Sequence, residues 1–307
     1  MIPRRLAWLA LNHIPGAGAV TLLRLASRFG SPEAALEATT EDLIAVGSLT
    51  PAQATALRHL AADGGRLEKL EQRLQEAGIW LVTADDQAYP TNLRSLRDAP
   101  PLLYVRGSFA PADDAGVAIV GTRSPSQHGA SVAADIARSL AGRGVTVVSG
   151  LALGVDGAAH RGALAAAGRT VAVLGSGLER VTPSRHRSLA EEVAGAGALV
   201  SEVPTGMLAS RETLLARNRI QAGLARAVIV AQCRRGGGSF ATAKRALQAG
   251  RPVLAVTWKE PEFAAGVERL ETMGARAAST SEVARLAAQA AFDPLPRTPQ
   301  LPLNDAA

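Results

Sequence analysis

The chain contains very little cysteine and no long uninterrupted apolar run. Its 307 residues include one cysteine, Cys233, so no disulfide can form within the chain. The paired-cysteine and His-Glu-x-x-His spacings of zinc sites are missing, and we expect neither a metal nor another cofactor. Charged residues interrupt each apolar run before the ~20 residues of a membrane-spanning helix, and no signal-cleavage site is visible. These absences predict a cytoplasmic protein without membrane association.

Aromatic residues are also scarce, and acidic residues are scarce over one long segment. Aromatic side chains make up 3% of the chain, which argues against a binding surface built from many stacking rings. The net charge is +6, and between residues 211 and 251 the only acid, Glu212, stands among nine basic residues: Arg211, Arg217, Arg219, Arg226, Arg234, Arg235, Lys244, Arg245 and Arg251. Such a cluster predicts attraction to a polyanion. The alternative is that these arginines are ordinary solvated surface charges.

Four short apolar strands each end in a polar turn that contains glycine. The strands begin at Val117, Val145, Val171 and Ala227. Continuous β-branched runs indicate strands that are buried on both faces, and residues 129–143 between the first two have helical apolar spacing. The sequence therefore predicts an α/β fold with a Rossmann-like, doubly wound and mostly parallel sheet. Glycine turns at the carboxyl ends of such strands favour phosphate binding.

The N-terminal residues predict a separate, small all-α domain. Residues 1–75 contain a helix, the turn Pro15-Gly-Ala-Gly18 and a second helix, similar to a helix-hairpin-helix (SAM-like) unit, with a weaker copy at residues 41–57. The hairpin amides can hold a phosphate, or the unit can be an architectural cap. We then expect a connector over residues 76–110 with strands near Trp80 and Leu103, a Rossmann-like domain over residues 111–290, and a disordered Pro-rich tail over residues 291–307.

Five ordered blocks carry a resemblance to a known family. They are Gly121–Gly129, Ser149–His160, Ser201–Pro204, Ala216–Leu224 and Gly237–Ala243. Through them the chain resembles the bacterial DNA-processing protein A (DprA, also called Smf) family from about Leu9 to Ser279. The resemblance implies a single-stranded-DNA-binding protein that forms a homodimer and protects DNA taken up in natural transformation. It also implies that the protein helps to load the RecA recombinase and is not an enzyme.

The candidate binding residues lie in these blocks and turns. Arg123 follows the first strand, where its guanidinium can grip a phosphate with two hydrogen bonds, and the resemblance implies that this arginine binds DNA. Ser184 stands where relatives often have a binding lysine, so the neighbouring arginines are included by proximity. The expected DNA- and phosphate-binding set is Gly121, Arg123, Ser149, Gly150, Gly154, Gly175, Gly177, Arg185, Arg187, Arg217, Asn218, Arg219, Gly237, Ser239, Thr242 and Lys244.

An enzyme or sensor for a small nucleotide, in the same Rossmann-like superfamily, is the rival interpretation. Asp156 and His160 share a helix face and could form an acid–base pair, but an aspartate at a helix start is more often a cap. A dehydrogenase is disfavoured because the second strand ends in Ser149-Gly150 instead of an acid. Similar phosphoribohydrolases carry a glutamate after a glycine turn, and residues 236–244 contain none. We therefore expect no catalytic residue, and Cys233 has no activating motif.

Overall fold

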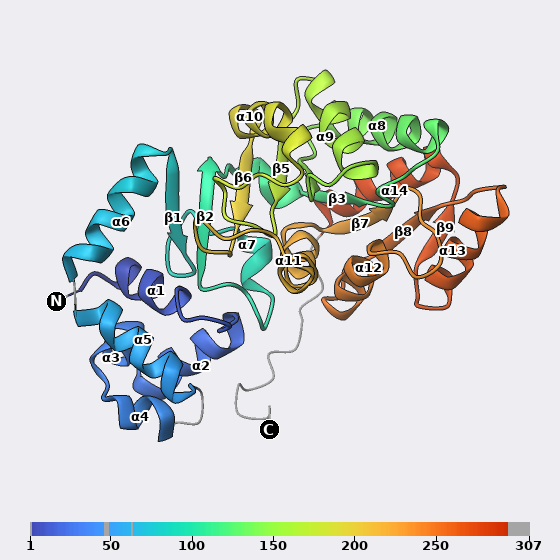
Figure 1. Ribbon diagram of the computed structural model, residues 1–307. Helices are drawn as coiled ribbons and strands as arrows, with labels where there is room; N and C mark the ends of the chain where they lie inside the picture. Colours follow the sequence, from blue (N-terminus) through green and yellow to red (C-terminus); the bar gives the residue numbers. More distant parts are fainter. Residues whose placement is uncertain (1, 46–48, 63, 294–307) are drawn as a thin grey trace.

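A bundle of helices precedes a sheet that helices flank (Figure 1). The computed structural model describes residues 2–45, 49–62 and 64–293. Within them, the helices before the first strand are α1 (Arg4–Asn12), α2 (Ala19–Phe29), α3 (Pro32–Glu37), α4 (Thr40–Ala45), α5 (Pro51–Ala62) and α6 (Gly64–Glu76). The turn at Pro15 separates α1 from α2, as the sequence predicts. The second predicted hairpin falls between α4 and α5, and residues 46–48 of its turn lie outside the described residues.

Local sequence explains where several of these helices begin and end. The Ser31 hydroxyl accepts a hydrogen bond from the amide of Ala34 at 3.0 Å, and Pro32 takes the first position of α3. α2 ends at Gly30, whose φ of 87° lies in the left-handed region that glycine tolerates. Capping residues therefore set the end of α2 and the start of α3.

The sheet contains nine strands within the described residues. They are β1 (Ile79–Thr83), β2 (Leu102–Gly107), β3 (Val117–Val120), β4 (Val147–Ser149), β5 (Thr170–Val173), β6 (Ala198–Ser201), β7 (Ala227–Val230), β8 (Val253–Val256) and β9 (Arg276–Ala278). Their order in space is β1-β2-β6-β5-β4-β3-β7-β8-β9. β2 runs antiparallel to β1 and β6, and the other neighbours are parallel. The predicted doubly wound, mostly parallel sheet is confirmed, and the strands near Trp80 and Leu103 extend it.

Helices cover both faces of the sheet, which explains the continuous apolar strands. One face packs against α8 (Gln127–Ala141), α9 (Val155–Ala165), α10 (Arg187–Ala196) and α14 (Thr280–Phe292). The other face packs against α7 (Thr91–Arg94), α11 (Arg211–Leu224), α12 (Ser239–Gln248) and α13 (Pro261–Glu271). Two short 3-10 helices, η1 (Pro111–Ala115) and η2 (Ser184–His186), lie in connections. In β3, Ile119 packs in the core on the α8 side of the sheet and Val120 in the core on the α11 side. Both faces of the strand are therefore buried.

The start of α8 and the end of α14 differ from the predicted bounds, because of a serine cap and a buried alanine respectively. α8 starts before residue 129 because the Ser126 hydroxyl accepts a hydrogen bond from the Gly129 amide at 3.0 Å. α14 extends two residues into the predicted tail, because Ala291 is buried in the core. Residues 294–307 of that predicted tail lie outside the described residues. In the part of the chain that is described, none of the helices is both long and apolar enough to cross a membrane.

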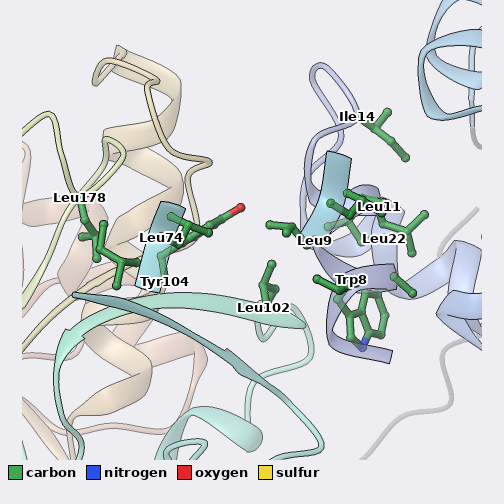
Figure 2. Packing of buried hydrophobic residues seen from close by; sticks show 14 of the residues in the cluster. Trp8, Leu9, Leu11, Ile14, Leu22, Leu74, Leu102, Tyr104 and Leu178 are labelled. Atoms are coloured by element: carbon green, nitrogen blue, oxygen red, sulfur yellow. The ribbon is translucent and has the colours of Figure 1, made fainter. Parts of the chain in front are cut away.

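The helical part and the sheet share one apolar core (Figure 2). Leu9 and Leu11 of α1 belong to the same cluster as Leu102 and Tyr104 of β2. The Tyr104 hydroxyl also donates a hydrogen bond to Oδ1 of Asn12 at 2.8 Å, at the end of α1. This shared core holds the N-terminal helices against the edge of the sheet.

We expect Leu9→Ala to lower the free energy of unfolding by roughly 2–5 kcal/mol, because it removes buried methyl groups and leaves a cavity. Leu9 is completely buried in the shared core. Val20→Ala, at an exposed position of α2, is the matched control and should change stability by less than about 0.5 kcal/mol. Denaturant unfolding measures both. Equal stability of the two variants would contradict a shared core around Leu9.

Candidate functional site

A pocket of about 730 Å³ opens at the carboxyl edge of the sheet, beside the ends of β3 and β7. Here the strand order reverses: β4 to β6 follow β3 on one side, and β7 to β9 lie on the other. The loop after β3, the glycine loop after β7 and the first turns of α11 form the walls. Ligands of doubly wound folds bind at this kind of switch point. The topology alone therefore places the candidate site.

The wall of this pocket is strongly cationic. Its lining includes one acid, Asp156, and five arginines, Arg123, Arg211, Arg217, Arg234 and Arg235. Arg234 is paired with Glu262 at 2.8 Å. Arg123, Arg211 and Arg235 are exposed, and no acid among the described residues pairs with them. The unbalanced positive charge favours an anionic ligand.

Arg217 is a buried cation beneath the pocket. Its Nη1 donates a hydrogen bond to the carbonyl of Val173 at 2.7 Å, at the end of β5. Burial lowers the pKa of Arg217, whereas the charge of Asp156 raises it. Burial likewise raises the pKa of Asp156, and the charge of Arg217 lowers it. A Cβ at Gly150 would collide with the Arg217 guanidinium, so glycine there makes room for the cation.

Three buried polar atoms that belong to lining residues lack a hydrogen-bond partner within the described residues. They are Nε of Arg217, Nε2 of Gln221 and Oγ of Ser239. Buried polar groups in folded proteins are nearly always paired, because an unpaired one costs about 1–3 kcal/mol. These three atoms lie buried at the pocket, where packing leaves part of their hydrogen-bonding capacity unused.

The pocket brings together seven of the sixteen predicted binding residues. Gly121, Arg123, Arg217, Asn218, Gly237, Ser239 and Thr242 all line it. They come from the loop after β3, from α11, and from the glycine loop with the start of α12. The sequence spacing of these segments is large, and the carboxyl ends of parallel strands bring them to one edge.

Four predicted glycines serve protein packing and do not line the pocket. A Cβ at Gly154 would meet the carbonyls of Thr122 and Arg123, and Gly154 also has a positive φ of 80°. Gly150 makes room for Arg217, as described above, and a Cβ at Gly175 or Gly177 would press against residues 204–214. Packing therefore accounts for glycine at these four positions, and their approach to a ligand stays a prediction. Close contact between loops requires glycine there.

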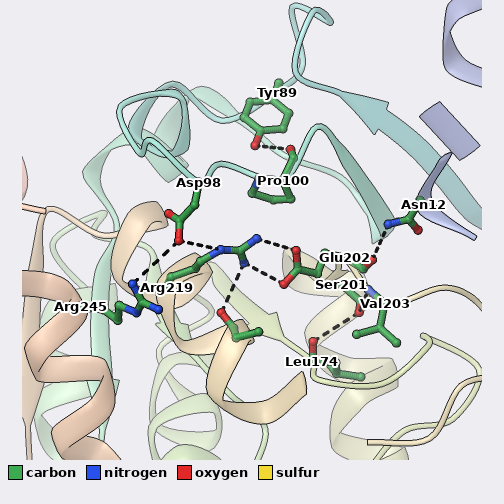
Figure 3. Close-up of polar contacts among 11 residues, drawn as sticks. Asn12, Tyr89, Asp98, Pro100, Leu174, Ser201, Glu202, Val203, Arg219 and Arg245 are labelled. Atoms are coloured by element: carbon green, nitrogen blue, oxygen red, sulfur yellow. Dashed lines mark hydrogen bonds and ion pairs between the residues drawn. The ribbon is translucent and has the colours of Figure 1, made fainter. Parts of the chain in front are cut away.

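Ser149 and Arg219 also differ from the expectation. The Ser149 hydroxyl is fully buried and donates to the carbonyl of Ile119 at 2.6 Å. Arg219 points away from the pocket and binds Glu202 with two hydrogen bonds of 2.7 and 2.6 Å; its Nε lies 3.3 Å from Asp98 (Figure 3). Two acids therefore already pair with the guanidinium of Arg219, so this arginine does not contribute its charge to the pocket.

The remaining predicted cations are exposed but lie outside the pocket. Arg185 and Arg187 are on and just after η2, and Lys244 lines a neighbouring hollow beside Phe240. The candidate-residue prediction missed Arg211, Arg234, Arg235 and Gln221. The three arginines belong to the basic cluster that composition singles out, so charge density was the available signal. Gln221 lies in the block Ala216–Leu224, four residues after Arg217 on the same face of α11, so helical spacing was the available signal.

The titratable groups nearby are buried. The buried His160 ring contacts the Thr170 hydroxyl at 2.7 Å, and burial lowers the pKa of His160 to about 3. Asp156 accepts a hydrogen bond from the amide of Ala152 at 3.4 Å, at the start of α9. Burial raises the pKa of the Cys233 thiol to about 11. The described residues contain no cluster of three or more His, Cys, Asp or Glu side chains suited to a metal.

Comparison with known proteins gives one consistent result. A family model described as DNA recombination-mediator protein A matches residues 80–288. Protein Smf of Synechocystis is 36% identical over 255 residues, which are 81% of this chain and 63% of that protein. This chain therefore matches less than two thirds of that relative's length.

Two solved structures are similar to this chain, one over nearly all of it and one over about two thirds. DNA processing protein A (DprA) of Streptococcus pneumoniae superposes with a TM-score of 0.79 and 28% identity, over 93% of this chain and 98% of that one. A second structure, described as giving the single-stranded DNA binding mode of DNA processing protein A from Helicobacter pylori, has a TM-score of 0.61 and 28% identity. It covers 68% of this chain and 96% of its own.

The buried His160 predicts a pH dependence of stability. Its pKa is lowered in the folded state, so the unfolded chain takes up the proton first as pH falls below about 6.5. The stability that neutral His160 contributes is complete above that pH and is lost toward pH 3, by up to about 1.4 kcal/mol per pH unit. We expect His160→Gln to flatten the plot of unfolding free energy against pH between these limits. His59→Gln, at an exposed position, is the control, and equal slopes for both variants would contradict the assignment.

Proposed function

Since the chain belongs to the family of DNA recombination-mediator protein A, we propose that its cationic pocket binds the sugar–phosphate backbone of single-stranded DNA. The observation that carries the proposal is the set of unpaired arginines, Arg123, Arg211 and Arg235, at the mouth of a pocket whose floor presents unpaired hydrogen-bonding groups. Arginine holds phosphate through two parallel hydrogen bonds. The single-stranded DNA binding mode described for the Helicobacter pylori relative supports the same ligand class.

A single strand suits this site better than a duplex. The cations surround a concave pocket, and their guanidinium groups must converge on phosphates that turn inward. A flexible strand can bend into such a pocket and expose polar groups to Gln221 and Ser239. A duplex is stiff over about 150 base pairs and presents a convex surface, so it would reach only the outermost arginines. We expect preference for single strands without strong sequence choice.

The finer role follows from the family. We propose a homodimeric recombination mediator that protects DNA taken up in natural transformation and helps RecA to assemble on it. Action beside RecA implies a cytoplasmic location. The role is one of binding, and the burial of Asp156 and His160 is consistent with a structural task for both. A mediator must release its strand to the recombinase. Contacts made mostly with phosphates allow this release, because each phosphate contact is weak.

A small-nucleotide site is the second candidate, because the unpaired polar atoms Arg217 Nε, Gln221 Nε2 and Ser239 Oγ belong to residues of one pocket. The two functions differ in their dependence on strand length. A nucleotide pocket gives one affinity for mononucleotides and oligonucleotides, whereas a strand-binding surface gains affinity as more phosphates are engaged. Competition between a mononucleotide and oligonucleotides of increasing length separates them.

We expect Arg123→Ala to weaken binding of single-stranded oligonucleotides by roughly 1–3 kcal/mol, the worth of a charge-assisted hydrogen bond. The slope of log affinity against log salt should become shallower by about 0.7, since one phosphate contact is lost. Fluorescence anisotropy at several salt concentrations measures both values. Arg285→Ala, an exposed arginine on α14, removes the same charge away from the pocket and is the control. Unchanged binding by Arg123→Ala would contradict the proposed site.

The mediator role predicts that the protein shortens the lag of RecA assembly on single-stranded DNA that a strand-coating protein already covers. The Arg123→Ala variant should lack this effect because it no longer holds the strand, while Arg285→Ala keeps it. ATP hydrolysis by RecA on the coated strand is the readout. Stimulation by Arg123→Ala equal to that of the unaltered protein would separate RecA loading from the pocket.

A further inference from the structure

Three exposed leucines border the cationic pocket. Leu215 of α11 lines it directly and is 45% exposed. Leu208 is 68% exposed and precedes the lining residue Ala209, and Leu153 is 38% exposed and follows the lining residue Ala152. We call Leu153, Leu208 and Leu215 the apolar rim. Seven large apolar side chains are exposed among the described residues, and the rim comprises three of them, one that lines the pocket and two that are next to lining residues in the chain.

The rim is held in place by the surrounding backbone. The carbonyl of Met207 accepts a hydrogen bond from the amide of Gly177 at 2.9 Å, which anchors the loop that carries Leu208. The Ser210 and Thr213 side chains cap the start of α11 and so fix the position of Leu215. An anchored loop that keeps a leucine in water forgoes the favourable burial of that side chain. That cost points to a ligand which covers these side chains.

The ligand must also suit the charges around the rim. Arg123, Arg211 and Arg235 lie at the same opening, unpaired by acids among the described residues. A purely apolar partner surface would leave these cations desolvated without compensation, which is costly. A nucleic-acid strand meets both demands, because each phosphate is followed by a base with an apolar face. The low aromatic content of this chain leaves aliphatic side chains as the available platform.

We propose that the apolar rim carries the nucleobases that neighbour the phosphates held at the pocket, by contact of the base faces with Leu153, Leu208 and Leu215. The inference rests on the proposed function, since it needs a strand held by the arginines. It adds a base-dependent, sequence-tolerant contribution to affinity that salt does not screen. Contact with a face is available to every base, so the rim gives no preference for one sequence.

The experiment compares two strands of equal length and equal phosphate number: an oligothymidylate and the same strand with abasic sites at its interior positions. The variant is Leu208→Ser combined with Leu215→Gln, and both positions are exposed, so folding should be preserved. Val20→Gln, an exposed position on α2, is the matched control. Leu208→Ser alone provides a second, milder variant.

We expect the unaltered protein and Val20→Gln to bind the abasic strand roughly ten-fold more weakly than oligothymidylate, as loss of base contacts implies. The double variant should lose about the same factor on oligothymidylate and almost nothing further on the abasic strand, with an unchanged salt slope. Leu208→Ser should lie between. Equal losses on both strands, or none, would overturn the inference.

Two further outcomes keep the inference separate from the proposed function. If light scattering shows that the double variant changes its oligomeric state, the rim is an interface between copies of the chain and the base-contact inference is wrong. If Arg123→Ala binds both strands as tightly as the unaltered protein does, the proposed function itself is contradicted. If Arg123→Ala binds weakly while the double variant binds normally, the proposed function stands and the inference alone fails.

Discussion

The chain leaves the sheet toward one face after β3 and toward the opposite face after β7. This topological constraint creates the site. After β3 it turns into α8 on one face, and after β7 it turns into α12 on the other. No helix can therefore close the gap above the two strand ends, and the loops that follow them face each other across a pocket. The glycine loop after β7 and Arg123 after β3 meet only because of this reversal.

A buried cation stiffens the floor of that pocket. Arg217 reaches from α11 to the carbonyl at the end of β5, over Gly150 at the end of β4, and its charge is balanced partly by Asp156 at the start of α9. One side chain thus ties together four elements that meet at the carboxyl edge. The arrangement keeps a buried positive charge beneath the pocket, below the exposed arginines. It also explains why position 150 is a glycine, since a Cβ there would collide with the Arg217 guanidinium.

Arg217 and Arg219 illustrate how tertiary packing assigns different tasks to neighbouring residues of one type. Residues two apart on a helix point to different sides, so the two arginines cannot serve the same pocket. Arg217 meets the pocket floor, and Arg219 meets Glu202 and Asp98 on the side toward the helical part of the chain (Figure 3). The second arginine therefore stabilises the junction between β6, α11 and the segment before β2. Its charge is neutralised where it stands and adds little to the field at the pocket.

The sequence by itself determined the fold class and six of the nine strands described, and it predicted that Arg123 lies at the carboxyl edge of the sheet, because these follow from local apolar runs and glycine turns. It also indicated the excess of positive charge through the scarcity of acids between residues 211 and 251. Only the tertiary structure decided which arginines are free. Arg219 is paired by acids 17 and 121 residues away, and Ser149 by a carbonyl 30 residues away. Partners that distant leave no periodic trace in the sequence, since ion pairs and close loop contacts depend on how the strands are ordered in space.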